Sequence, residues 1–326
     1  MEFSKHIFEF IKPAKTSRGE YTEKIHYKIS LYHNHKMGCG EIAPLPDLSP
    51  DGCVDYESIL HELLYLSNEE LYNYSCDNMA NLPALNFAVE SALAKLKSKK
   101  SPFAEGQGIK INGLVWMDNI DEMWDAALKK GRDGFECLKF KVGALDHDSE
   151  CRLIEKVRKE FPKLTLRLDA NGGFTVDDAL LKLKDFGRFN IHSIEQPIKA
   201  GQWDAMQEIC AKSFIDIALD EELIGNGANM TALLQNIKPQ YIILKPTLLG
   251  GFSICNDWII EGKKIGANWW VTSALEGNIG LLAIAEWCSH YDLSLPQGLG
   301  TGALYKENFE SELSLSSDTL SYQPKT

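Results

Sequence analysis

The sequence predicts an α/β protein whose main part is a parallel barrel of repeated strand–helix units. Five short apolar runs between residues 137 and 246 carry ionisable side chains at or near their ends. These side chains are Lys141, Asp169, Glu195, Asp220 and Lys245. They follow one another at steps of 25 to 28 residues, which is about the length of a strand, a loop and a helix. Because this step is repeated, and because 326 residues exceed one ordinary domain, we expect a barrel with a smaller module attached.

Residues 1–108 lack the regular step and predict a separate α+β module. Its strands are expected over residues 3–11, 25–32 and 39–43. A leucine-rich stretch over 56–71 predicts one helix, and Pro83 suits the first turn of another helix. The segment 98–108, rich in lysine, serine and glycine, is expected to join this module to the barrel.

The barrel itself is expected to occupy residues 109–301. Its first strand and first helix are expected over 109–116 and 121–130, its seventh strand over 268–273, its last helix over 279–288 and its eighth strand over 293–295. Thr175, followed by Asp178, predicts the start of the helix after Asp169, because a threonine hydroxyl can accept a hydrogen bond from a backbone N–H of the first turn. Residues 302–326 leave the regular step and predict a separate C-terminal segment.

Strand alternation indicates which way the ionisable side chains face. Side chains two positions apart share a face, so Lys139 points with Lys141 and Arg167 points with Asp169. The opposite faces are apolar and should pack on helices, so the charged set should point into the barrel, at the end where barrel enzymes keep their sites. Buried charges are costly unless they are paired or bound to a metal. Three carboxylates beside lysines therefore predict an oxygen-ligand site for a hard divalent cation, with a base next to it. Arg167 lies one layer deeper and is expected to make a structural ion pair.

Charge and cysteine content narrow the class of protein. The chain has 46 acidic and 34 basic residues and a net charge of −12, which argues against a nucleic-acid partner. None of the eight cysteines forms a CxxC pair, so reduced thiols in the cytoplasm are expected. Residues 1–15 lack the apolar core of a signal peptide, and no apolar run is long enough to cross a membrane. The composition favours a cytoplasmic protein.

The motifs at the strand ends resemble those of the enolase superfamily, in its muconate-lactonizing subgroup. They read Lys139-x-Lys141, Asp169-Ala170-Asn171, Glu195-Gln196-Pro197, Asp220-Glu221 and Lys245-Pro246, in the order and spacing of that family. Within the subgroup the chain is most similar to the o-succinylbenzoate synthase family, through residues 16–19, 40–46 and 272–280. The resemblance covers nearly the whole chain. It implies a modified TIM barrel of the (β/α)7β type, with an α+β capping domain built from the N-terminus and the C-terminal tail.

The resemblance also implies a reaction. Asp169, Glu195 and Asp220 would hold Mg²⁺, which would bind the carboxylate of a hydroxycyclohexadiene carboxylic acid with a succinyl arm. Lys141 would take the α-proton, giving an enediolate held by the metal, and would then protonate the departing hydroxyl. Lys245 would stabilise the intermediate from its other face as a cation, with Lys139 supporting the site electrostatically. The implied enzyme is a carbon–oxygen lyase that makes o-succinylbenzoate in menaquinone biosynthesis.

Several residues near these motifs are candidate substrate contacts. Arg18, on the mobile loop of the cap, would meet a substrate carboxylate when the loop closes, or would remain a solvated loop charge. Ser273 and Glu276 would line the site. Asn171 would hydrogen-bond near the site, or would only end its strand. Glu221 is expected to point outward and to orient lysine or ligand groups.

Other functions compete with dehydration. Two lysines on opposite faces of a substrate would also suit an N-acylamino acid racemase or a dipeptide epimerase of the same superfamily. Dipeptide epimerases usually carry Asp-x-Asp at the end of strand eight, and residues 293–297 lack that pair. In a metal-free aldolase barrel, Lys245 would instead form a Schiff base with a carbonyl substrate. A binding or scaffold protein on the same fold would usually have lost some of these ligands or bases, and all five are present.

Overall fold

A computed structural model describes residues 1–16, 19–97 and 101–324, and its main body is a curled sheet of seven parallel strands. The sheet order is β11-β10-β9-β8-β7-β6-β5. These strands are β5 (Gly113–Val115), β6 (Cys137–Lys141), β7 (Thr165–Asp169), β8 (Ser193–Glu195), β9 (Asp216–Leu219), β10 (Tyr241–Leu244) and β11 (Asn268–Val271). Neighbours in sequence are neighbours in the sheet, as repeated right-handed strand–helix units require.

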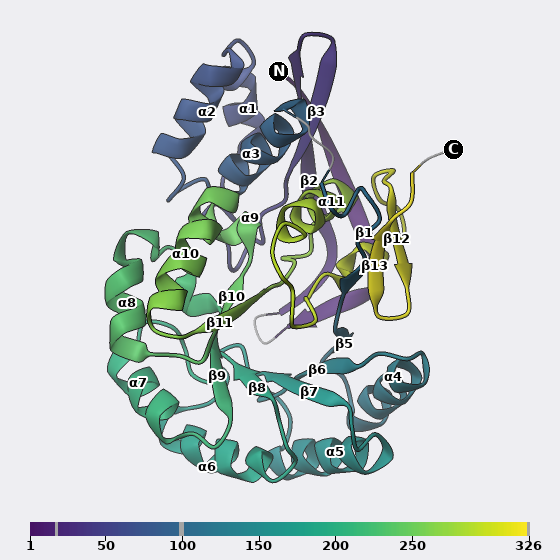
Figure 1. Ribbon diagram of the computed structural model, residues 1–326, viewed down its shortest axis with the longest axis vertical. Helices are drawn as coiled ribbons and strands as arrows, with labels where there is room; N and C mark the ends of the chain where they lie inside the picture. Colours follow the sequence, from purple (N-terminus) through teal and green to yellow (C-terminus); the bar gives the residue numbers. More distant parts are fainter. Residues whose placement is uncertain (17–18, 98–100, 325–326) are drawn as a thin grey trace.

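Helices follow the barrel strands and cover the outside of the sheet (Figure 1). They are α4 (Ile120–Arg132), α5 (His147–Glu160), α6 (Val176–Gly187), α7 (Trp203–Lys212), α8 (Met230–Ile237), α10 (Phe252–Lys264) and α11 (Asn278–Cys288). The predicted start of α6 is confirmed, because the Thr175 side chain accepts a hydrogen bond from the Asp178 backbone N–H. Within residues 1–16, 19–97 and 101–324, every helix is too short or too polar to cross a lipid bilayer.

The barrel is closed at a short eighth position, Gln297–Gly298. Gly298 bridges to Thr272 after β11, and Gln297 bridges to Ile111 before β5, both in the parallel sense. The Asn112 N–H donates to the Gln297 carbonyl at 2.9 Å, and the Ser273 N–H donates to the Gly298 carbonyl at 3.0 Å. The prediction of an eighth strand over 293–295 is therefore wrong in position, because the chain pairs only where it reaches the glycine-rich turn. The architecture is the expected (β/α)7β form of the TIM barrel.

The stretch predicted as the first barrel strand, 109–116, is divided between two sheets. β4 (Ile109–Lys110) pairs antiparallel with β13 (Thr319–Tyr322), which pairs in turn with β12 (Leu313–Ser316). β5 belongs to the barrel, and Ile111, between β4 and β5, bridges to its eighth strand position. The tail hairpin thus packs beside the entry to the barrel, whereas Tyr305 bridges to Phe10 of the cap.

The N-terminal module is an antiparallel three-stranded sheet with three helices on it. The strands are β1 (Glu2–Thr16), β2 (Gly19–His33) and β3 (Lys36–Ile42), and the helices are α1 (Tyr56–Leu63), α2 (Asn68–Asp77) and α3 (Pro83–Lys97). Gly38 and Gly40 let α3 lie directly on β3, since a Cβ at either position would come within 2.0 Å of the Ala92 carbonyl oxygen or 1.9 Å of the Ala88 carbonyl oxygen. Figure 1 shows this module beside α9 (Pro246–Leu249), α10 and α11.

One helix predicted over 56–71 is in fact two. Ser67 caps the start of α2 by accepting from the Glu70 N–H, and the Glu70 carboxylate accepts from the Ser67 N–H in return. This reciprocal pair satisfies backbone groups that a continuous helix would not leave free. The sequence contains this Ser-x-x-Glu signal, but the run of leucines across it led to the prediction of one continuous helix.

Candidate active site

Three carboxylates meet inside the barrel at the carboxyl ends of adjacent strands. Asp169 and Glu195 are the last residues of β7 and β8, where they are paired in register, and Asp220 directly follows β9. All three side chains are buried, and one oxygen of each lies within 4.8 Å of the others. The predicted convergence of these three residues is therefore what the strand register produces.

Lysines surround the carboxylates and pair with them. Lys139 Nζ donates to Asp169 Oδ2 at 3.0 Å and to Glu195 Oε2 at 2.8 Å. Lys141 Nζ donates to Asp169 Oδ2 at 2.7 Å, and Lys245 Nζ donates to Asp220 Oδ2 at 2.5 Å. Each buried ammonium group thus has a carboxylate partner, which offsets much of the cost of its desolvation.

Lys141 and Lys245 stand on facing walls of the barrel. Lys141 ends β6, and Lys245 directly follows β10, with β7, β8 and β9 between these two strands in the sheet. In a barrel closed by an eighth strand position, this separation is half of the circumference. The two amines therefore approach the middle of the site from opposite sides.

Burial and mutual charge perturb the pKa values in this cluster. Burial raises the pKa of Asp169, but the ammonium groups of Lys141, Lys139 and Lys245 outweigh it and hold that pKa well below its usual range. Burial, opposed by Lys139, raises the pKa of Glu195 to about 7, and the Asp169 carboxylate adds to the rise. Such opposed shifts within one cleft are typical of functional sites.

The donor set fits a hard divalent cation. Glu195 Oε1 is buried and has no hydrogen-bond partner among the described residues, which is costly for a carboxylate oxygen unless something else binds it. Carboxylate oxygens are the ligands that Mg²⁺ prefers. A dication between Asp169, Glu195 and Asp220 would also supply the positive charge that three close carboxylates need.

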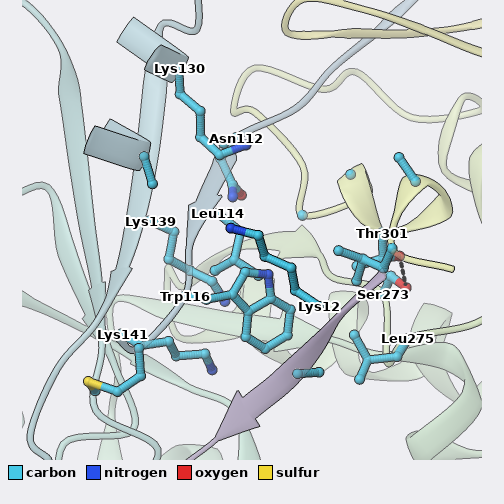
Figure 2. A pocket seen from close by; sticks show the side chains of 18 of the residues that line it. Lys12, Asn112, Leu114, Trp116, Lys130, Lys139, Lys141, Ser273, Leu275 and Thr301 are labelled. Carbon is cyan, nitrogen blue, oxygen red and sulfur yellow. Dashed lines mark hydrogen bonds between the residues drawn. The ribbon is translucent and has the colours of Figure 1, made fainter. Parts of the chain in front are cut away.

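A cavity of about 750 Å³ opens above this cluster and is shared by the barrel and the cap. Lys139, Lys141 and Lys245 line it from the barrel. Figure 2 shows Lys139 and Lys141 on one side of it and Ser273 and Leu275 on the other. The cavity also extends along α4 and to Leu315 of the tail hairpin, so its volume includes more than the space above the carboxylates.

Some of the predicted substrate contacts line the cavity and others do not. Asn171 lines the cavity and accepts from Lys141 Nζ at 2.6 Å, and Ser273 also lines it. Glu276 does not line the cavity; its buried carboxylate accepts from the Ser273 hydroxyl and from Thr247 Oγ1 at 2.5 Å. Its expected direct contact with substrate is replaced by a role in holding Ser273. Arg18 lies outside the described residues.

Two further sequence expectations are wrong. Arg167 forms no ion pair within the described part of the chain; its guanidinium stacks 3.9 Å over the Trp270 ring, and Nη1 donates to the Pro296 carbonyl at 2.8 Å. Glu221 was expected to point outward, but it is buried and accepts from Asn171 Nδ2 at 3.0 Å. Because Asn171 also holds Lys141, Glu221 can still orient that lysine. A helical turn begins directly after Asp220 and turns the Glu221 side chain inward. Strand alternation, which was the basis of the prediction, does not apply beyond the end of the strand.

Sequence reasoning missed the residues of the cap that reach the cavity. Lys12, on β1, lines it, as do Leu45 and Leu48 after β3. Lys24, on β2, is buried and holds the cavity wall by donating to the Ala274 carbonyl at 2.8 Å and the Leu275 carbonyl at 2.9 Å. Both lysines lie in strands that carry several other polar residues, so no local pattern marks them as part of the site.

The chain matches known proteins over nearly all of its length. Residues 122–314 match the family described as enolase C-terminal domain-like. An o-succinylbenzoate synthase of Desulfotalea psychrophila is 39% identical, with 94% of each chain covered. One from Haemophilus influenzae is 26% identical over 81% of this chain and 78% of its own.

Solved structures agree on the fold. MenC from Desulfotalea psychrophila superposes with a TM-score of 0.83 at 36% identity, covering 98% of this chain and 99% of its own. The L-Ala-D/L-Glu epimerase from Bacillus subtilis gives a TM-score of 0.87 at 22% identity, covering 98% and 95%. The second likeness concerns the fold alone.

Proposed function

This chain belongs to the enolase superfamily and is a lyase, and from that premise we propose that it is an o-succinylbenzoate synthase, which removes water from a hydroxycyclohexadiene carboxylate with a succinyl arm. The observation that carries the proposal is the arrangement of two lysines on facing walls across three carboxylates that lie within 4.8 Å. The relative from Desulfotalea psychrophila, which bears that name, supports the choice of substrate.

The carboxylates would form the floor of the reaction site. Asp169, Glu195 and Asp220 would hold Mg²⁺, which when bound would bind the substrate carboxylate and lower the energy of the anion formed by loss of the α-proton. Lys139 holds Asp169 and Glu195 close to each other through its two hydrogen bonds. A bound cation would also give the buried Glu195 Oε1 a partner, which it lacks among the described residues.

Lys141 would carry the proton through both steps. Its amine takes the α-proton from the ring carbon, and the electron pair of the broken C–H bond passes to the carboxylate end of the substrate. The C–O bond to the ring hydroxyl then breaks, and Lys141 returns the same proton to the leaving oxygen, so that water is released. Asn171 Oδ1, at 2.6 Å from Lys141 Nζ, orients the amine for this work.

Lys245 would act from the opposite face without moving a proton. Burial lowers the pKa of Lys245, but the carboxylates of Asp220, Glu221 and Asp169 together outweigh it and raise that pKa, so the side chain stays an ammonium ion. A fixed cation over the planar intermediate stabilises its negative charge more than it stabilises the neutral ring of the substrate.

Racemisation of N-acylamino acids is a second candidate, because the same two facing amines could remove and return a proton on opposite faces. Dipeptides are less suited. The segment after the closing bridge at Gln297–Gly298 reads Leu299-Gly300-Thr301, with no carboxylate for a substrate ammonium group.

The test is an absorbance assay of the purified protein with the hydroxycyclohexadiene substrate and Mg²⁺. Deuterium exchange from solvent into N-acylamino acids and dipeptides is measured beside it. We expect dehydration that stops with EDTA and returns with added Mg²⁺. Exchange into amino-acid substrates without any dehydration would overturn the proposal in favour of the racemase. We also propose a cytoplasmic setting, which the free state of all eight cysteines supports.

A further inference from the structure

Gln196 directly follows Glu195 at the end of β8 and takes no part in the proposed proton transfer. Its side chain is completely buried, and its φ of 37° lies in the left-handed region. A residue with a long side chain adopts this conformation only where its surroundings impose it, and such positions gather at functional sites. The contacts that hold Gln196 therefore indicate what it does.

Sheet pairing alone does not fix Asp220 relative to Glu195. Glu195 is in register with Asp169 on one side and with Ala218 on the other. The pairing of β8 with β9 ends at Ala218, and Asp220 lies two residues beyond it, at the start of a helical turn. The separation of the Asp220 and Glu195 side chains therefore depends on contacts outside the ladder.

The backbone of Gln196 is bonded to the segments that carry the other two carboxylates. Its N–H donates to the Ala218 carbonyl at 2.9 Å, and its carbonyl accepts from the Gly172 N–H at 2.6 Å. Ala218 lies two residues before Asp220, and Gly172 lies three residues after Asp169. One residue thus joins the chain segments of all three carboxylates.

The side-chain amide of Gln196 adds a direct bond to Asp220. Its Oε1 accepts from the Asp220 N–H and from the Glu222 N–H, each at 3.2 Å. Its Nε2 donates to the Ile198 carbonyl at 3.0 Å and to Glu222 Oε2 at 3.1 Å. The amide thereby uses both of its N–H donors and both lone pairs of its oxygen, so it is held in a single orientation.

A neutral amide suits this position better than a carboxylate would. A carboxylate at position 196 would face the Ile198 carbonyl and the Glu222 carboxylate, where the amide now donates to both. It would also add a negative charge near three buried carboxylates. Glu222 is itself buried, and its other oxygen accepts from the Gly201 N–H at 2.8 Å, so the amide is bonded to a fixed partner.

We infer that Gln196 is a positioning residue that sets the spacing of the three carboxylates and makes the site selective for a small dication. The inference rests on the proposed function, which makes Asp169, Glu195 and Asp220 the ligands of Mg²⁺. This ion requires nearly ideal octahedral coordination at about 2.0–2.1 Å, whereas Ca²⁺ accepts irregular coordination at about 2.3–2.6 Å. Because Gln196 does not line the cavity, it acts only through the carboxylates.

Calorimetry with Mg²⁺ and with Ca²⁺, in the absence of substrate, tests this role on two variants. Gln196→Met keeps the length of the side chain and removes the amide. Gln196→Asn keeps an amide and suits the left-handed backbone, but it is one methylene too short to reach the Asp220 N–H. We expect both variants to bind Mg²⁺ about 10- to 100-fold more weakly, as loss of an outer-shell partner does, and Ca²⁺ no more than about 3-fold more weakly.

Gln240→Met is the matched control. The Gln240 amide also joins two backbone groups, since Oε1 accepts from the Ile217 N–H at 2.9 Å and Nε2 donates to the Cys210 carbonyl at 3.5 Å. Ile217 lies toward the amino end of β9, away from the carboxylates. We expect Gln240→Met to lower the urea midpoint of unfolding and to leave the ratio of the Mg²⁺ and Ca²⁺ affinities unchanged.

The ratio of the two affinities decides the inference. A folded Gln196→Met or Gln196→Asn with an unchanged ratio would overturn it, and so would an equal fall in both affinities. Circular dichroism shows whether each variant is folded, and Gln196→Asn decides if Gln196→Met is not. Failure of both variants to fold would mean that Gln196 serves the fold as a whole, which would also refute a specific role at the metal site.

The same titrations separate this inference from the proposed function. An unsubstituted protein that does not bind Mg²⁺ would refute the proposed metal site, and the role of Gln196 with it. Suppose instead that the unsubstituted protein binds Mg²⁺ and Glu195→Gln weakens that binding, while both Gln196 variants keep the original preference over Ca²⁺. That result would leave the proposed function standing and refute the inference alone.

Discussion

Lys24→Met tests whether a buried lysine holds the cap against the wall of the cavity. Lys24, on β2, is 5% exposed, and burial lowers its pKa from 10.5 to about 8, with Glu276, Glu41 and Asp51 opposing the fall. Its amine donates to the Ala274 carbonyl at 2.8 Å and to the Leu275 carbonyl at 2.9 Å. Removing it leaves the Ala274 carbonyl without this donor.

The wall that Lys24 holds is under conformational strain. Leu275 has φ of 62°, a left-handed conformation that a leucine adopts only when its surroundings impose it. The Tyr305 hydroxyl also donates to the Leu275 carbonyl, at 2.6 Å, so this carbonyl keeps one donor in the variant. At pH 7 we expect Lys24→Met to cost about 1–3 kcal/mol, the price of one buried carbonyl left unsatisfied.

The pH dependence of that difference has a definite sign. The folded protein releases the Lys24 proton near pH 8, whereas the unfolded chain keeps it to about pH 10.5. Between these values the unfolded state binds more protons, so this lysine makes the folded state more stable as the pH rises. One pH unit between the two pKa values is worth about 1.4 kcal/mol, and less near pH 8, where the folded-state amine is half titrated. The stability of the unsubstituted protein relative to Lys24→Met should therefore rise by about 1.5 kcal/mol between pH 8 and 9.5.

Urea unfolding of both proteins at several pH values, followed by circular dichroism, measures this difference. Lys36→Met, which changes an exposed lysine, should track the unsubstituted protein at every pH. A stability gap that stays flat or narrows from pH 8 to 9.5 would refute the reasoning, because it would mean that Lys24 titrates as an ordinary lysine.

Three further changes test the site and the fold. Lys141→Ala should reduce turnover by at least about 10³-fold while calorimetry still finds Mg²⁺ binding; residual turnover near the original rate would contradict the base assignment. Glu195→Gln should weaken Mg²⁺ binding by about 10-fold or more, because a charged ligand becomes neutral, and an unchanged affinity would place the ion elsewhere. Ser67→Ala should lower the free energy of unfolding by about 1 kcal/mol through loss of the α2 cap, and urea unfolding with no change would show that α1 and α2 do not need it.

The convergence of the three carboxylates was predictable because it follows from the arrangement of parallel strands alone. Parallel strands bring their carboxyl ends to one edge, so residues at strand ends must meet, whatever the helices between them contain. Asp169 and Glu195 end their strands in register, and Lys141 ends the strand beside them. Strand alternation then places Lys139 on the same face as Lys141 but two residues earlier, deeper in the barrel. There its amine donates hydrogen bonds to both carboxylates.

The parts that were not predictable depend on pairing between distant segments. The eighth strand position lies at Gln297–Gly298 because the backbone there hydrogen-bonds to residues on both neighbouring strands, and an apolar run alone does not reveal these partners. They are Lys110 and Asn112 on one side and Val271 and Ser273 on the other. Arg167 stacks on Trp270, which is about 100 residues away, and so its partner could not be read from its own strand. Lys12 reaches the cavity through a bulge that is fixed from the C-terminal segment.

A crystal structure with Mg²⁺ and o-succinylbenzoate bound tests the central assignment most directly. The account predicts one ion coordinated by oxygens of Asp169, Glu195 and Asp220, with the amines of Lys141 and Lys245 on opposite faces of the ring. An ion bound away from these carboxylates, or a ring with both amines on one face, would contradict it.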